Sequence, residues 1–231
     1  MTPQEIITRA GEEGREVLTE AESKELLRGL GIRTTQMRAA ATRDEAVAAS
    51  HEVGYPCVLK VASPDITHKS DAGGVKVGLA DEHAVVAAFD AILASCREQY
   101  PEARIDGVTV QDMAPPGLEV IVGTATDPQF GPVVMFGLGG VWVEVLEDVS
   151  FKVAPLTRDD ARAAVGEIRA ARLLDGFRGS DPVDKAALED ILLRVSEFAA
   201  ATPAVREMDL NPVFAYPDGA VAVDARVILG E

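Results

Sequence analysis

Apolar and polar positions follow two periodicities along this chain, one helical and one typical of strands. Apolar residues three and four apart predict helices, whereas continuous apolar runs or strict alternation predict strands. After a weakly specified arm or helix over residues 1–18, helices are expected over residues 18–29, 43–52, 81–100, 158–174 and 182–201. Strands are expected over residues 34–39, 55–62, 75–79, 105–111, 118–124, 132–136, 142–145, 151–154, 213–216 and 220–225. Helices and strands are mixed and several strands follow one another directly, so the pattern predicts an α+β fold.

Two of the predicted helices carry capping signals. Thr19 followed three residues later by Glu22 forms a capping box, in which each side chain bonds the backbone N–H of the other residue. Thr42 is placed to cap the next helix, and Gly54 is placed to end it. These signals fix the beginnings of two helices more firmly than the apolar spacing does.

The pattern is interrupted once by a strong break, Pro115-Pro116-Gly117, directly after a predicted strand. We therefore expect two α+β lobes with a joint near residues 111–117. The predicted lobes are residues 1–110 and residues 111–231. No internal repeat and no low-complexity tract is present.

Composition and charge exclude several classes of protein. The formal net charge is −16, which argues against a nucleic-acid partner because such proteins need a basic face. Apolar residues make up 47% of the chain, yet no run is long enough to span a membrane, and the charged N-terminus lacks the apolar core of a signal peptide. We expect a cytoplasmic protein without a membrane partner. Its two cysteines, Cys57 and Cys96, are then expected to be reduced core thiols.

Residues 54–79 contain the most suggestive chemistry. A predicted strand carries Lys60, a polar loop follows with His68, and Gly73-Gly74 precedes a second strand. A lysine beside a glycine-rich loop is one way to bind nucleotide phosphates, since the ammonium group meets one phosphate and backbone N–H groups reach others. A loop histidine can accept a phosphoryl group. The alternatives are a strand-end lysine that reaches water, a simple Gly-Gly turn and a histidine with one local hydrogen bond.

A second group of residues near the C-terminus has the chemistry of a magnesium site. Asp209 and Asn211 lie two positions apart on an extended segment, so their side chains share a face. Asp224 is expected on the returning strand of a hairpin, facing them, and Glu207 lies nearby. Magnesium prefers oxygen ligands and takes one or two carboxylates together with substrate phosphates. The alternative is an Asn-Pro turn surrounded by scattered acidic residues.

Five segments, in this order, resemble one family. They are SPDITHKSDAGGV, PPGLEVIVGTATDPQFGPVVMFGLGG, WVEVLEDVSFKVAPL, LLDGFRG and EMDLNPV with VDARV. Together they resemble the ATP-grasp (β) subunit of ADP-forming acetate- or acyl-CoA ligases, and more distantly the β subunit of succinyl-CoA synthetase. The resemblance covers about Leu18 to Leu229 and implies an ATP-grasp fold of two α+β lobes that hold ATP or ADP with Mg²⁺.

The resemblance also implies a role for individual residues. Asn211 and Asp224 correspond to the residues that hold magnesium, with Asp209 in support. His68 corresponds to a histidine that carries a phosphoryl group between subunits. The implied nucleotide-binding residues are Lys60, Gly73 and Gly74 for the phosphates, Gln111, Asp112 and Met113 for the adenine, and Glu119 for the ribose.

The resemblance further implies that this chain is half of an enzyme. In the family, a CoA-binding α subunit or a further domain of a fused chain binds CoA and the small carboxylate, and nothing in this sequence supplies it. The P-loop pattern and a GxGxxG after a first strand are both absent, which excludes two other nucleotide-binding classes. Two alternatives remain: a stand-alone ATP-grasp ligase that joins a carboxylate to an amine, and a non-enzymatic module that binds nucleotide.

Overall fold

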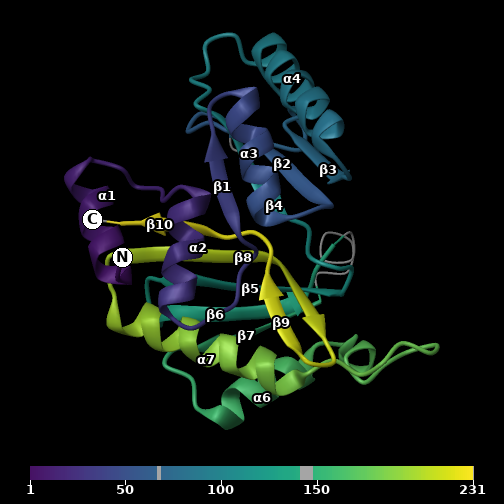
Figure 1. Ribbon diagram of the computed structural model, residues 1–231. Coiled ribbons are helices and arrows are strands. Elements are labelled where there is room, and N and C mark those ends of the chain that lie inside the picture. The colour runs from purple at the N-terminus through teal and green to yellow at the C-terminus, as the bar shows by residue number, and fades with distance from the viewer. Residues whose placement is uncertain (67–68, 141–147, 231) are drawn as a thin grey trace. The chain divides into compact units, whose positions relative to one another are not determined.

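The computed structural model describes residues 1–66, 69–140 and 148–230. The chain divides into two compact units (Figure 1). The small unit is Thr35–Pro115, and the large unit combines Met1–Thr34 with Pro116–Glu231. Both units combine helices with an antiparallel sheet, as the resemblance to ATP-grasp proteins predicts.

The small unit is a four-stranded antiparallel sheet with both of its long helices on one face (Figure 1). The strands lie in the order β1-β4-β2-β3, and alternate side chains of β2 and β4 enter the core under the helices. Leu59, Val61, Val108 and Val110 pack there against α3 and α4. The elements are β1 (Met37–Ala40), α3 (Arg43–Val53), β2 (Cys57–Ala62), β3 (Val75–Leu79), α4 (Glu82–Gln99) and β4 (Gly107–Asp112).

The large unit is built on a six-stranded antiparallel sheet in the order β10-β8-β5-β6-β7, with β9 paired to β8. Helices α6 and α7 pack on one face of this sheet, and α1 and α2 complete the same core (Figure 1). The elements are α1 (Pro3–Glu12), α2 (Glu20–Gly29), β5 (Leu118–Asp127), β6 (Gly131–Leu138), β7 (Val149–Val153), α6 (Arg158–Glu167), the 3₁₀ helix η1 (Ala171–Leu173), α7 (Lys185–Ala201), β8 (Val205–Tyr216), β9 (Gly219–Ala222) and β10 (Arg226–Leu229).

The predicted lobe boundaries need one correction. The joint near residues 111–117 agrees with the observed transition at Pro115, but residues 1–34 pack in the large unit and not in the lobe that follows them in sequence. Ile6 and Leu26 are fully buried in the core of the large unit. The backbone N–H of Leu18 donates to the carbonyl of Val227, which joins this segment to the C-terminal strand.

The capping prediction for helix α2 is confirmed, and so is the one for α3. Thr19 accepts from the backbone N–H of Glu22, and Thr42 caps α3 in the same way with Glu45. Gly54 ends α3 with a φ of 88°, a conformation that suits glycine. For the N-terminal segment the sequence allowed either an arm or a helix, and the structure has helix α1 there. This helix has a third capping box, between Thr2 and Glu5.

The single helix predicted over residues 158–174 is wrong. Helix α6 ends at Glu167, Ile168 is extended, and a short 3₁₀ turn follows. The buried carboxylate of Asp148 accepts from the N–H groups of Arg169 (2.7 Å) and Ala170 (2.8 Å). Because a side chain from another segment takes these two N–H groups, the helical hydrogen-bond pattern stops there.

Two further strand predictions differ from the structure. Strand β10, which pairs with β8, was not expected, and β8 begins eight residues earlier than predicted. The strand predicted over residues 142–145 lies outside the described residues. Among the residues that the structure describes, no helix is both long and apolar enough to cross a membrane.

A buried ion-pair cluster joins α1 to α2. The Glu22 carboxylate, only 8% exposed, accepts from Arg9 (2.8 Å) and from both terminal nitrogens of Arg15 (2.8 Å each). Burial alone would raise the pKa of Glu22, but the hydrogen bonds from Arg15, Thr19 and Arg9 outweigh burial and hold this pKa at about 2. The ionised carboxylate is therefore the form that the fold stabilises.

We expect this carboxylate to make stability depend on pH. The folded pKa lies below the unfolded value of about 4.3, so the stabilisation is complete above that value and is lost as the pH falls toward 2. Glu22→Gln should lower the free energy of unfolding at pH 7 by roughly 3 kcal/mol and flatten its dependence between pH 5 and 2. Urea unfolding across this range measures both effects. Glu52→Gln, which removes an exposed partner of Arg38, is the control and should change little.

Candidate functional site

The sheet face of the large unit opposite α6 and α7 carries the predicted magnesium residues. Along β8, Met208 and Leu210 enter the helix-covered core, whereas Asp209 and Asn211 alternate with them and lie on the opposite face. Asn211 is exposed and Asp209 is half-buried. The prediction that these two side chains share a face agrees with this alternation.

The third predicted ligand, Asp224, lies in the loop between β9 and β10, not on a returning strand. Strand β9 pairs Ala222 with Val213, and β10 pairs Arg226 with Asp209. If the β8–β9 pairing is continued by two residues beyond Ala222, or the β8–β10 pairing by two residues before Arg226, Asp224 comes opposite Asn211. Residues opposite each other in an antiparallel pair have their side chains on the same face. The register therefore supports the predicted meeting of Asn211 and Asp224 although the strand is interrupted between them.

Asp209 is surrounded by other acidic side chains in this group. Burial raises the pKa of Asp209 most strongly, and the nearby carboxylates of Glu207 and Asp224 raise it further. Arg226 lowers this pKa, but only enough to offset part of the increase. In the described ranges 1–66, 69–140 and 148–230, no three His, Cys, Asp or Glu side chains lie close enough together to hold a metal ion. Two carboxylates and one amide oxygen are a donor set that fits magnesium when phosphate oxygens complete the coordination.

Glu119, the predicted ribose ligand, lies at the start of β5, and two glycines make room for it. Its carbonyl accepts from the N–H of Gly139 at 2.8 Å. A Cβ atom on Gly140 would lie 2.8 Å from the Glu119 Oε2 atom, and one on Gly139 would lie 3.0 Å from its Cβ atom. The glycines that follow β6 therefore leave space for the carboxylate, and a carboxylate can accept hydrogen bonds from two hydroxyl groups. This close contact explains why glycines occupy positions 139 and 140.

Gly140→Ala should disturb the Glu119 carboxylate, and Gly14→Ala is a closely matched control. Both glycines have a φ of 67°, so each substitution carries a similar backbone strain of about 1 kcal/mol. Only at Gly140 would the new methyl group meet the carboxylate, whereas nothing lies within 4 Å at Gly14. We expect similar losses of stability but weaker ADP binding only in Gly140→Ala, measured by calorimetry. Equal ADP affinity in the two variants would remove Glu119 from the nucleotide site.

In the small unit, Lys60 lies on the face of β2 that the helices do not cover. It is opposite Val75 of β3 and Thr109 of β4, and it is buried. Gln111, also buried, lies on the same face of β4, and its amide donates to the Thr109 hydroxyl at 3.4 Å. A buried lysine is an expensive group, so this position does not fit the alternative of a strand-end lysine that reaches water.

Strand β4 ends at Asp112, within the predicted adenine-binding segment. Asp112 is half-buried and Met113 is exposed. The segment thus leaves the sheet at the predicted place, near the transition to the large unit at Pro115. Its role in nucleotide binding stays a prediction.

The N–H groups of Gly73 and Gly74 are used within their own turn in this structure, and the phosphate-binding role of the two glycines stays a prediction. Their N–H groups donate to the carbonyls of Ser70 (3.0 Å) and Lys69 (2.8 Å), so neither N–H is available to a phosphate in this arrangement. A Cβ atom on Gly73 would lie 2.6 Å from the Ser95 hydroxyl, and one on Gly74 would lie 2.7 Å from Val61. Both residues are glycines because the turn packs closely against α4 and β2.

His68 lies outside the described residues, but the chain on either side of it is anchored. Ile66 and Ala72 are buried in the small-unit core. The Ser63 hydroxyl accepts from the N–H of Ile66 at 3.3 Å, and the Ala72 carbonyl accepts from the Ser95 hydroxyl at 2.9 Å. The described residues on both sides of the predicted polar loop are therefore held by the core of the small unit. Of the other two histidines, His51 is exposed beside Glu82, and His83 is also exposed.

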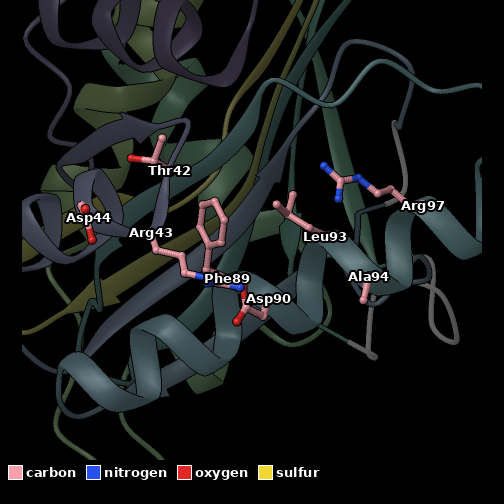
Figure 2. Close-up of a pocket in the computed structure, with 8 residues that line it drawn as sticks. All are labelled: Thr42, Arg43, Asp44, Phe89, Asp90, Leu93, Ala94 and Arg97. Carbon is pink, nitrogen blue, oxygen red and sulfur yellow. The ribbon is translucent and has the colours of Figure 1, made fainter.

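A surface hollow of about 660 Å³ lies between the start of α3 and helix α4 (Figure 2). Arg43 and Asp90, which line it, form an ion pair at 2.6 Å. None of the predicted site residues lines this hollow. We therefore assign it no part in nucleotide binding.

Comparison with known proteins identifies the class to which this fold and these residues belong. The chain belongs to the ATP-grasp domain family, whose model matches residues 9–229. It is 50% identical over 97% of its length to the β subunit of acetate–CoA ligase (ADP-forming) I of Pyrococcus furiosus, and it covers 97% of that subunit. It is also 48% identical to acetate–CoA ligase (ADP-forming) I of Archaeoglobus fulgidus over 99% of this chain, which spans only 33% of that longer relative.

Solved structures agree with this assignment. An acetyl-coenzyme A synthetase from Ca. Korarchaeum cryptofilum, in complex with coenzyme A and Ca-AMPCP, superposes with a TM-score of 0.97 at 48% identity, covering 99% of this chain and 100% of the other. The same synthetase with Mg-AMPPCP gives a TM-score of 0.88 at 46% identity over the same shares, and there a phosphohistidine segment points towards the nucleotide binding site. The resemblance to the acyl-CoA ligase family is thus confirmed.

Proposed function

We propose that this chain is the nucleotide-binding subunit of an ADP-forming acyl-CoA ligase. The complete enzyme interconverts acyl-CoA, ADP and phosphate with the free carboxylate, CoA and ATP. The chain belongs to the ATP-grasp family, and it is 50% identical to an acetate–CoA ligase β subunit. Both findings support this assignment. The structural observation that carries it is the group formed by Asp209, Asn211 and Asp224 on the sheet face opposite α6 and α7.

Each unit contributes its own residues to the proposed nucleotide and metal binding. In the large unit, Asn211 and Asp224 are the proposed magnesium ligands, Asp209 supports them, and Glu119 is proposed to bind the ribose. In the small unit, Lys60 is proposed to bind a phosphate. The adenine is proposed to bind to Gln111, Asp112 and Met113. Bound Mg²⁺ would neutralise charge on the phosphate oxygens, and phosphoryl transfer depends on such charge stabilisation together with positioning. The Mg-AMPPCP complex of the archaeal relative supports this pairing of cation and nucleotide.

His68 is the proposed carrier of the phosphoryl group. A neutral imidazole is a competent nucleophile, and the transfer breaks the bond from ADP to the γ-phosphorus of ATP while it forms a phosphorus–nitrogen bond on the histidine. In the reverse direction the phosphohistidine returns the group to ADP. The phosphohistidine segment of the archaeal relative supports the assignment.

The partner is proposed to be a CoA-binding α subunit, which also binds the small carboxylate. Support comes from the longer Archaeoglobus relative, in which the matched part is one third of the protein. The direct test mixes this chain with that subunit and supplies acetyl-CoA, ADP, phosphate and Mg²⁺. We expect ADP binding by the chain alone but ATP synthesis only when both subunits are present. Acetyl-CoA-dependent ATP synthesis by this chain alone would contradict the proposal, as would ADP release that depends on an amine and needs no partner.

A further inference from the structure

Strand β10 carries an arginine on the same sheet face as the proposed magnesium ligands. Ala225 and Val227 are buried in the core of the large unit, so Arg226, which lies between them, is on the face opposite α6 and α7. The pairing of β10 with β8 places Arg226 directly opposite Asp209. Arg226 is exposed. A solvent-accessible cation therefore lies beside the acidic group that is proposed to hold magnesium.

The side chain of Arg226 can share a ligand with this group. Directly opposed residues of an antiparallel pair have Cβ atoms about 4.5–5.5 Å apart, and diagonal neighbours, about 7–8 Å apart, are still within reach of long side chains. Asp209 is the opposed residue and Asn211 the diagonal one. The charge of Arg226 acts on the Asp209 carboxylate. Within the described part of the chain, however, the guanidinium group forms no ion pair, so its donors are available to a ligand.

A phosphate group on this face needs such a donor. The carboxylates of Glu207, Asp209 and Asp224 lie near one another, so a phosphate brought there meets negative charge. A magnesium ion coordinates some of the phosphate oxygens, and the remaining oxygens need hydrogen-bond donors of their own. A guanidinium group presents its N–H donors in a planar fork that fits a phosphate with two parallel hydrogen bonds. The position and the chemistry of Arg226 therefore suit a phosphate ligand.

We propose that Arg226 binds the β-phosphate of the nucleotide, next to the magnesium ligands. This inference rests on the proposed function, which gives this sheet face a magnesium-bound nucleotide. Arg226 donates to oxygens of the β-phosphate that the magnesium ion leaves uncoordinated, and it does so with ADP and with ATP. The alternative role is charge balance alone, in which Arg226 offsets the repulsion among the neighbouring carboxylates and touches no ligand. The two roles differ in the sign of their effect on nucleotide affinity.

Calorimetry of ADP and AMP binding by the complete chain, with Mg²⁺ present, tests this role. Arg226→Ala should weaken ADP binding about 20-fold, the size expected of a charge-assisted contact to a phosphate. AMP lacks the β-phosphate, so its affinity should not change. Arg226→Lys keeps the charge but loses the planar fork, and it should weaken ADP binding about fivefold. The control is Arg162→Ala, an exposed position on α6 at the other face of the sheet, which should bind both nucleotides normally.

The same titrations separate phosphate binding from charge balance. If Arg226 only offsets the carboxylates, Arg226→Ala makes the group more negative, and the Mg²⁺ concentration needed for half-maximal ADP binding falls. ADP affinity of Arg226→Ala equal to or above that of the wild-type chain would therefore overturn the proposal. Equal losses of ADP and AMP affinity would also overturn it, because they would place the effect away from the β-phosphate. If the wild-type chain itself binds no ADP, the proposed function fails instead.

Discussion

His68→Ala should reduce ATP synthesis by the assembled ligase at least about a thousandfold, because a covalent carrier has no substitute when its nucleophile is removed. The same variant should bind ADP with normal affinity, since the proposed nucleotide ligands are other residues. Coupled-enzyme turnover and calorimetry measure the two properties. The expected result is therefore a loss of rate without a loss of binding.

His83→Ala is the matched control for this experiment, because His83 is an exposed histidine on helix α4. It should leave both turnover and ADP affinity unchanged. Normal turnover of the assembled His68→Ala ligase would eliminate an obligatory phosphohistidine and leave His68 as an ordinary loop residue.

Asp224→Asn should reduce turnover by at least about 100-fold and raise the magnesium concentration needed for half-maximal rate. The substitution is chosen because the Asp224 Oδ1 atom accepts from the N–H of Ala225 at 2.8 Å, and an amide oxygen can preserve this bond. The loss of one negative charge opposite Asn211 is then the main change. A magnesium titration of the rate separates a weaker metal site from a damaged fold.

The control for Asp224 is Asp218→Asn, at the exposed turn between β8 and β9. Its backbone carbonyl, not its carboxylate, accepts from Arg33, so that contact survives the substitution. Asp218→Asn should behave like the wild-type protein. Wild-type turnover of Asp224→Asn at low magnesium would remove Asp224 from the metal site.

Local chemistry predicted the beginnings of the capped helices α2 and α3 and the strand β3 of the small unit. The capping boxes at Thr19 and Thr42 depend on residues three positions apart, so they are visible in the sequence alone. Strand β3 was predicted with its observed bounds, Val75–Leu79. The shared face of Asp209 and Asn211 followed in the same way from the period of an extended chain.

The errors arose where distant segments act on local structure. Nothing within residues 1–34 indicates that Ile6 and Leu26 pack in the core of the large unit. The end of α6 is set by Asp148, about twenty residues earlier in the chain, through bonds that no local pattern reveals. The close packing of Gly73 against Ser95 of α4, and of Gly74 against Val61 of β2, is likewise set by segments outside the turn.

Phosphate tracking at the level of single peptides tests the central claim most directly. The chain and the α subunit are incubated with γ-labelled ATP and Mg²⁺ and are then digested. The resulting peptides are separated under alkaline conditions that preserve phosphohistidine. The account predicts acid-labile, base-stable label on the peptide that contains His68, and loss of this label when unlabelled ADP is added. Label that reaches the α subunit without ever appearing on the His68 peptide would contradict it.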